Sequence, residues 1–201
     1  GSELGSPKWG ADTSLQFRER MLKPFWDHHL KGVKPAAPLP PVLAFETGTN
    51  QWHTWGAWPP ADETEPARLY LQPGGGLSFD APGAGGGPFT EYVSDPAKPV
   101  PYRVRPIRPS FGPGSTWSRW LVDDQRPFAD RPDVLVFVGE PLTAPVSVSG
   151  QVAVTLFAAT TGTDADWVVK LIDLYPNEVP ARPELGGYQL MISGDILRGR
   201  Y

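Results

Sequence analysis

The sequence has no cysteine, no long apolar run and no cluster of basic residues, and each of these absences excludes a class of protein. With Cys 0, a disulfide framework, a thiol nucleophile and a thiolate zinc site are all excluded. No segment approaches the ~18 apolar residues of a membrane-spanning helix. The net charge of −4 is small and the basic residues are scattered, so neither a membrane nor nucleic acid is an expected partner.

Motifs that carry chemistry are also scarce. A nucleophile elbow needs Gly-x-Ser-x-Gly between a strand and a helix, and the nearest match, residues 76–80, lacks the second glycine. Of the three histidines, His28 and His29 are adjacent on a predicted helix and point about 100° apart, and His53 falls in a predicted aromatic-rich loop. The glycine triplets lack the lysine and the helix of a phosphate-binding loop. We therefore predict no catalytic residue, no metal site and no cofactor in this chain.

One helix is predicted, from about Asp12 to Leu30, before a proline-rich connector. Asp12 or Thr13 can cap its first turn, and Gly32 suits its end. Pro24 lies inside the helix and should kink or split it. Its apolar face is broad, so the helix needs a partner surface on another domain or on the rest of the chain. The residues of this face are Leu15, Phe17, Met21, Leu22, Phe25, Trp26 and His29.

After the connector, short apolar runs alternate with turns that are rich in glycine and proline, which number 22 and 25. No helical pattern separates these runs, so an antiparallel β-sandwich of the jelly-roll type is predicted. The predicted strands are Val42–Glu46, Arg68–Leu71, Phe89–Val93, Val134–Val138, Pro145–Ser149, Gln151–Ala159, Trp167–Tyr175 and Tyr188–Ser193.

Two further segments complete this reading of the chain. Residues 73–88, dominated by glycine, are predicted to form a loop. Residues 196–201 look like the start of a further element, and we expect the native chain to continue beyond them.

Charged and aromatic clusters offer candidate sites, each with a structural and a functional interpretation. Asp123, Asp124 and Arg126 lie close to Arg131 and Asp133, which predicts either a salt-bridged brace of a loop or a wall of a substrate pocket.

The other acidic and aromatic clusters also have two interpretations. Asp164 and Asp166 form either a strand-end turn or the start of a calcium loop, although the glycine and the distant glutamate of an EF-hand are absent. The tryptophans cluster at 52–58 and 117–120, where they either pack at a domain interface or stack on sugars.

Several motifs together resemble the superfamily of X-Pro dipeptidyl-peptidases and cocaine esterases. Residues 25–32 resemble the helix that closes its α/β-hydrolase domain, and residues 42–58 resemble the crossing into its jelly roll. The subgroup is indicated by TTGTDADWVVKLID at 160–173, which is similar to α-amino acid ester hydrolases and glutaryl-cephalosporin acylases. Further matching motifs are residues 123–126, 131–135, 140–142, 187–190 and 198–201.

The resemblance implies a mainly-β chain. Residues 1–35 would be the end of an α/β-hydrolase domain, and residues 36–201 a jelly-roll β-sandwich of the galactose-binding-like type, with further strands expected outside the chain. The Ser, His and Asp of the family lie in the hydrolase domain, upstream of Gly1, which again implies no catalytic residue here. The jelly roll would supply a wall of the pocket, and the candidates for it are Trp117, Trp120, Asp123 and Arg126.

The implied partners are the hydrolase and cap domains of the same protein and a small ester or amide substrate. The resemblance also allows a homo-oligomer and a secreted or periplasmic location. The alternative is a stand-alone β-sandwich module that binds carbohydrate through exposed tryptophans.

Overall fold

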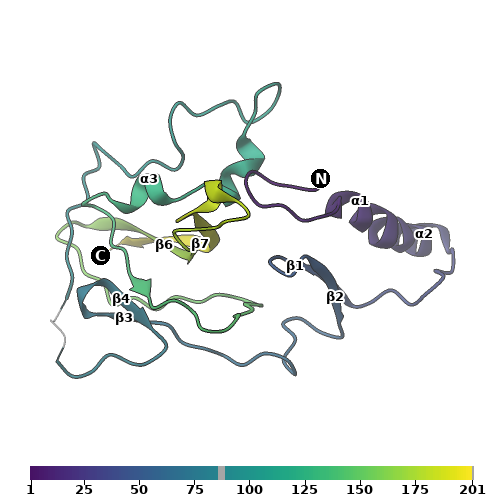
Figure 1. Ribbon diagram of the computed structural model, residues 1–201, viewed down its shortest axis with the longest axis horizontal. Coiled ribbons are helices and arrows are strands. Elements are labelled where there is room, and N and C mark those ends of the chain that lie inside the picture. Colours follow the sequence, from purple (N-terminus) through teal and green to yellow (C-terminus); the bar gives the residue numbers. More distant parts are fainter. Residues whose placement is uncertain (86–88, 201) are drawn as a thin grey trace. The chain divides into compact units, whose positions relative to one another are not determined.

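The computed structural model describes residues 1–85 and 89–200, which form two compact units. Unit 1 comprises residues 1–64 and 149–151, and unit 2 comprises residues 65–148 and 152–201. Figure 1 labels the α-helices and most of the strands along the chain. Within the described residues, no helix combines the length and the apolar character needed to cross a bilayer.

Unit 1 begins with the predicted helix, which forms three successive segments. These are α1 (Thr13–Phe17), the π-helical turn η1 (Arg18–Leu22) and α2 (Lys23–Lys31). The Asp12 side chain accepts a hydrogen bond from the Leu15 N–H at 2.9 Å, and Gly32 ends the helix with φ of 68°. The predicted disturbance at Pro24 takes the form of the π turn, because proline lacks the N–H that a regular helix needs there.

The rest of unit 1 is a hairpin built around Trp52. Its strands β1 (Val42–Glu46) and β2 (Gln51–Trp55) are antiparallel. The Trp52 ring stacks on Phe17 of α1 at 6.3 Å and meets Phe45 at 5.2 Å, and its Nε1–H donates to Gln16 at 2.8 Å. The predicted loop at residues 52–58 is therefore partly wrong, because Trp52 and His53 lie in β2, where aromatic residues fit a paired strand.

Unit 2 holds two sheets. The smaller contains β3 (Tyr70–Gln72), β4 (Gly76–Ser78) and β5 (Val138–Gly139), with the 3₁₀ turn η2 (Pro73–Gly75) between the first two. β3 and β4 are antiparallel, whereas β4 and β5 are parallel, which departs from the antiparallel prediction. β4 also lies within residues 73–88, which were predicted to be all loop; residues 86–88 lie outside the described part.

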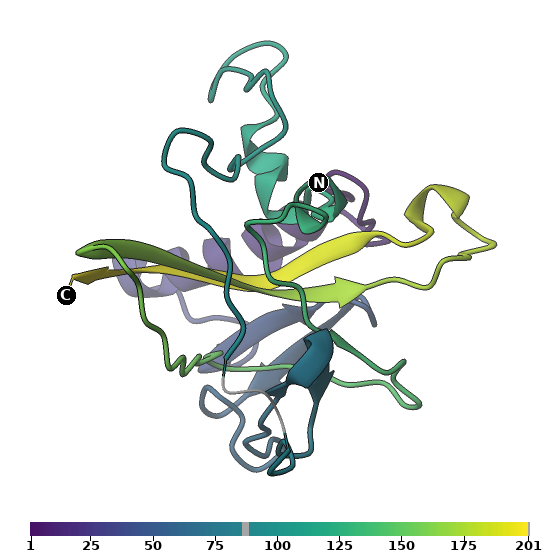
Figure 2. The same cartoon turned by 90° about the vertical axis from the view of Figure 1, so that its left-hand side faces the viewer.

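The larger sheet is the long antiparallel ribbon of β6 (Asp164–Leu174) and β7 (Gln189–Arg200), which Figure 2 shows in yellow and green. β6 confirms the strand predicted at 167–175. The strand predicted at 188–193 is longer than expected, because residues 196–200 pair with β6 instead of starting a new element. Tyr201 lies outside the described residues.

Three other elements of unit 2 surround its small core. They are η3 (Trp117–Val122), α3 (Arg126–Ala129) and η4 (Pro183–Leu185). The buried apolar residues among those described are Val122, Phe128, Leu185 and Tyr188. Each of these three elements therefore contributes one buried side chain, and the fourth, Tyr188, immediately precedes β7.

Four predicted strands were wrong in whole or in large part. Residues 89–93, 145–149 and 151–159 form no strand, and only the last residue of 134–138 does so. Their apolar side chains are exposed, as at Val146 and Val148. The physical reason is that β propensity becomes a strand only where a neighbouring strand supplies a ladder, and these residues have none in the described part. The mainly-β class is confirmed, whereas the closure of a jelly roll remains a prediction.

Candidate functional site

All four predicted pocket residues come from one stretch of unit 2. Trp117 and Trp120 lie on η3, Asp123 immediately follows its last residue, and Arg126 opens α3. Pro127 in the first turn of α3 has no N–H to satisfy there and so suits the start of a short helix. The stretch thus joins two short helices through a three-residue corner, Asp123 to Gln125, that carries charged and polar side chains.

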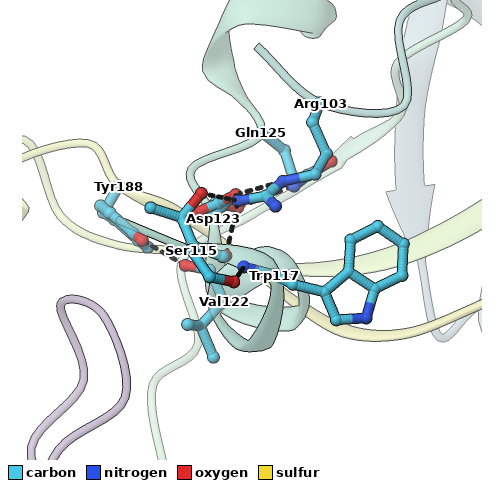
Figure 3. A network of polar contacts seen from close by, with 8 residues as sticks. Arg103, Ser115, Trp117, Val122, Asp123, Gln125 and Tyr188 are labelled. Atoms are coloured by element: carbon cyan, nitrogen blue, oxygen red, sulfur yellow. Dashed lines mark hydrogen bonds and ion pairs between the residues drawn. The ribbon is translucent and has the colours of Figure 1, made fainter. Parts of the chain in front are cut away.

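The aromatic part of the site includes a residue that sequence reasoning missed. The Tyr102 ring lies 6.0 Å from the Trp117 ring and 5.5 Å from the Trp120 ring. Trp117 and Tyr102 remain exposed, by 39% and 51%. In Figure 3 the Trp117 ring points away from the neighbouring polar contacts. Structure therefore brings the two predicted tryptophans together through a third ring and leaves part of that group open.

The polar part is centred on Arg103, whose side chain is only 8% exposed. Its Nη2 and Nε donate to the same carboxylate oxygen of Asp123 at 2.9 and 3.2 Å. Nη2 also donates to the main-chain carbonyl and the hydroxyl of Thr116, at 2.9 and 3.2 Å. Asp123 is therefore engaged by an arginine and is not poised as a free acid or base.

Arg126 is not brought next to Asp123, but faces Asp124 and the start of β7. Its Nε donates to the Asp124 carboxylate at 2.7 Å, and its Nη1 donates to the Gly186 carbonyl at 3.0 Å. Asp124 also accepts from the N–H of Gln189 at 3.3 Å. Burial acts to raise the pKa of Asp124, but these hydrogen bonds outweigh it and leave the pKa below its usual value. The pKa of Arg126 is raised by its bond to Asp124.

Beneath this corner lies a buried polar support. Gln125 is 6% exposed; its Nε2 donates to the Asp123 carbonyl at 2.7 Å, and its Oε1 accepts from Lys170 Nζ at 2.6 Å. The same ammonium lies 5.6 Å from the centre of the Phe128 ring. Burial lowers the pKa of Lys170. Gln125 therefore joins the main chain at Asp123 to Lys170 of β6 through two hydrogen bonds.

The geometry favours the brace interpretation for the predicted charge cluster, which separates into arginine–aspartate pairs. Besides the pairs above, Arg131 Nη2 lies 2.6 Å from Asp133, whose pKa is lowered by that contact, and it also donates to the Lys98 carbonyl at 2.9 Å. An open hollow of about 350 Å³ is lined by Asn177, Glu178, Val179, Pro180 and Pro183, and none of the four candidates lines it. Their role in a substrate pocket therefore stays a prediction.

Sequence reasoning missed Tyr102 and Arg103, because the six prolines of residues 96–113 indicate only that no central strand forms there. Nothing in the residues next to Asp123 indicates that its partner is Arg103, twenty residues earlier in the chain.

The predicted calcium alternative does not fit the positions of Asp164 and Asp166. Both lie in β6, and the carboxylate of Asp166 accepts from Arg198 at 2.6 and 2.8 Å across the ribbon. Asp164 lies 3.3 Å from Arg200. In the part of the chain that the structure describes, no group of three or more His, Cys, Asp or Glu side chains could hold a metal ion.

Comparison with known proteins gives the chain its family context. Residues 35–200 match the family of X-Pro dipeptidyl-peptidase C-terminal non-catalytic domains. The chain is 33% identical over 192 residues to the cocaine esterase of Rhodococcus sp. (strain MB1 Bresler), which covers 93% of this chain and 31% of that protein.

Two solved structures are similar over nearly the whole chain. One is an aminopeptidase from a marine sediment Thaumarchaeota archaeon, with 52% identity, a TM-score of 0.91, and coverage of 99% of this chain and 32% of that one. The other is a selenomethionine-labelled α-amino acid ester hydrolase, with 48% identity, a TM-score of 0.86, and coverage of 100% and 33%. The chain thus spans about a third of the length of each relative.

These matches confirm the resemblance that the motifs predicted, to cocaine esterase and to α-amino acid ester hydrolases. The family match extends over residues 35–200 of 201, and the chain therefore belongs to the X-Pro dipeptidyl-peptidase C-terminal non-catalytic domain family.

Proposed function

We propose that this chain is the C-terminal part of a serine hydrolase that cleaves small esters or amides, and that it completes the substrate pocket without supplying catalytic groups. The observation that carries the proposal is that relatives 33–52% identical are an esterase, an aminopeptidase and an amino acid ester hydrolase, each about three times longer than the matched region. In this proposal residues 1–35 end the hydrolase domain, and residues 36–201 form the jelly roll.

The chemistry would follow the serine-hydrolase pattern. A serine outside residues 1–201 attacks the ester or amide carbonyl while a histidine takes its proton, and the histidine passes that proton to the alcohol or amine that leaves as the C–O or C–N bond breaks. Water or an amine then attacks the acyl-serine, giving its proton to the histidine, and the histidine returns the proton to the serine as the acyl product is released. An aspartate orients that histidine. The hydrolase and cap domains of the same protein are the proposed partners of this chain.

Within this scheme the group of Tyr102, Trp117 and Trp120 forms the proposed wall. The rings are held together at 5.5 and 6.0 Å yet Trp117 and Tyr102 remain accessible, as a surface for an apolar acyl or leaving group requires. Asp123 and Arg126 support this wall through ion pairs with Arg103 and Asp124.

The test compares the full-length gene product with residues 1–201 alone, using chromogenic amino-acid esters and a serine-directed inhibitor. We expect inhibitor-sensitive turnover by the full-length protein and none by residues 1–201. Trp117→Ala and Trp120→Ala should each lower kcat/KM by about tenfold or more, as losing apolar contact in a pocket does. Trp58→Ala, which removes an exposed tryptophan in unit 1, serves as the control.

Two results would contradict the proposal. Turnover by residues 1–201 alone would reveal a catalytic site within the chain. Full-length protein that hydrolyses no ester or amide, together with saturable binding of oligosaccharides by residues 1–201 that Trp117→Ala abolishes, would favour the carbohydrate-binding alternative.

A further inference from the structure

The helix that carries the two tryptophans is unusual for its length. η3 holds six residues, Trp117–Val122, in 3₁₀ conformation, whereas runs beyond three or four residues are uncommon because their hydrogen-bond geometry is poor. The side chain of Thr116, the residue before η3, makes no capping hydrogen bond to the helix, and the Ser115 hydroxyl accepts only a long bond, of 3.3 Å, from the Trp117 N–H. Such a segment needs support from elsewhere in the fold if the side chains on it are to hold one position.

Arg103 supplies that support at both ends of η3. Its Nη2 donates to the carbonyl and hydroxyl of Thr116, the residue before η3, and to the carboxylate of Asp123, the residue after it. One planar guanidinium therefore joins the two ends of the helix from a position thirteen and twenty residues earlier in the chain. At 8% exposure, little water competes for these bonds.

The neighbouring residue acts on the rings of the same helix. The Tyr102 ring contacts the rings of Trp117 and Trp120. Arg103 instead binds the residues at the two ends of the helix that carries those rings. Two consecutive residues of an irregular segment thus act on both the main chain and the side chains of η3. We call the residue pair Tyr102–Arg103 the η3 clamp.

We infer that Arg103 is a positioning residue, which sets the places of the Trp117 and Trp120 rings by holding both ends of η3. The inference concerns ring positions and rests on the proposed function only for what the rings do for a substrate. It assigns Arg103 no contact with a substrate, because all its hydrogen bonds in the described part go to Thr116 and Asp123.

The geometry requires arginine and not merely a positive charge. The contacts at Thr116 and Asp123 use two nitrogens of one rigid plane, Nη2 and Nε. A lysine offers a single ammonium on a flexible stem and cannot reproduce that fork. Nη1 of Arg103 has no hydrogen-bond partner in the described part, so the clamp depends on the Nη2 and Nε side of the group.

The chain contains a matched control. Arg131 also pairs with a nearby aspartate, Asp133, and donates to a main-chain carbonyl, that of Lys98. Like the Arg103 pair it lies in unit 2, but it contacts neither end of η3. Replacing either arginine by lysine removes the same kind of contact. Only the replacement at Arg103 should move the tryptophan rings.

The experiment is ¹⁹F NMR of the full-length gene product labelled with 5-fluorotryptophan. Trp117→Phe and Trp120→Phe assign the two resonances by their disappearance. We expect Arg103→Lys to shift or broaden both resonances and to leave the other tryptophans in place, and Arg131→Lys to move neither. Thr116→Val, which removes only the hydroxyl contact, should produce a smaller change in the same two resonances and is available if Arg103→Lys folds poorly.

The inference is overturned if Arg103→Lys and Thr116→Val leave both resonances unchanged, or if Arg131→Lys moves them as much as Arg103→Lys does. Ester kinetics separate this outcome from failure of the proposed function. If Arg103→Lys displaces the rings and raises KM with kcat unchanged, the result supports both the positioning role of Arg103 and the pocket-wall role of the rings. Displaced rings with unchanged kinetics support the clamp and contradict the pocket-wall role.

Discussion

The hydroxyl of Tyr188 donates a hydrogen bond to the main-chain carbonyl of Val122, which ties the last residue of η3 to the residue preceding β7. Both residues are buried, at 6% and 9% exposure. The bond joins positions 66 residues apart, so it holds the last residue of η3 next to the start of the long ribbon. Because both residues are buried, water cannot readily take the place of the Tyr188 hydroxyl if this bond is lost.

Tyr188→Phe should destabilise the protein by about 1–3 kcal/mol, because the Val122 carbonyl would be left buried without this partner. The measurement is the free energy of unfolding from denaturant titration. Tyr92→Phe removes the hydroxyl of an exposed tyrosine and should change little. Equal effects of the two substitutions would show that the buried bond makes no special contribution.

The Asp124 carboxylate should make stability depend on pH in the acid range. Its pKa in the folded state lies below the usual value, so the unfolded state binds more protons in the window between the two values. The stabilisation is therefore fully present above about pH 4, where an unfolded aspartate is ionised, and is lost as pH falls through the folded pKa.

We accordingly expect Asp124→Asn to lower stability at neutral pH and to flatten the loss of stability on acidification, as measured by melting temperature between pH 3 and pH 7. Asp62→Asn, at an exposed aspartate, should leave the acid limb as it is. An unchanged acid limb in Asp124→Asn would contradict the assigned role of the Arg126 contact.

Gly186 should not tolerate a side chain. A Cβ at this position would lie 2.4 Å from the Asn177 carbonyl oxygen and 3.3 Å from that of Pro183. Because the clash is with backbone, Gly186→Ala should force the loop to move and cost about 1–3 kcal/mol. Gly162→Ala, where the nearest atoms are 3.7 Å away, is the control. Equal stability of the two variants would show that the loop can shift without cost.

The ion pair of Asp166 and Arg198 should contribute little to stability despite its short distances. Its side chains are 47% and 61% exposed, and exposed pairs contribute little to stability and weaken with salt. Asp166→Asn should therefore lower the unfolding free energy only slightly, and by even less in 1 M NaCl.

Calcium should not raise the melting temperature, because Arg198 and Arg200 occupy the carboxylates of Asp166 and Asp164. A calcium-dependent increase that EDTA reverses, and that Asp166→Asn removes, would restore the metal-site interpretation.

Predictions from the sequence were reliable where the residues that determine a helix or strand all lie within that segment. The helix with its Asp12 cap and its Gly32 end and the strand at β6 were predicted because capping, glycine and β-branched residues act within a few positions. Residues 151–159 show the opposite case. They are as rich in β-branched residues as β6, yet without a neighbouring ladder they form no strand.

The candidate site divides in the same way. The motif from Asp123 to Arg126 and the tryptophans of 117–120 could be singled out from the sequence, since residue type and spacing marked them. Their partners could not, because Tyr102, Arg103, Gly186 and Tyr188 meet them only after distant segments fold together.

The sequence by itself determined the mainly-β class, the absence of thiol chemistry and the family, because composition and motif order suffice for these. Only the tertiary structure decided that Asp123 pairs with Arg103 while Asp124 pairs with Arg126. A carboxylate can satisfy its charge with any nearby arginine. Which arginine is near depends on chain paths that no local preference encodes.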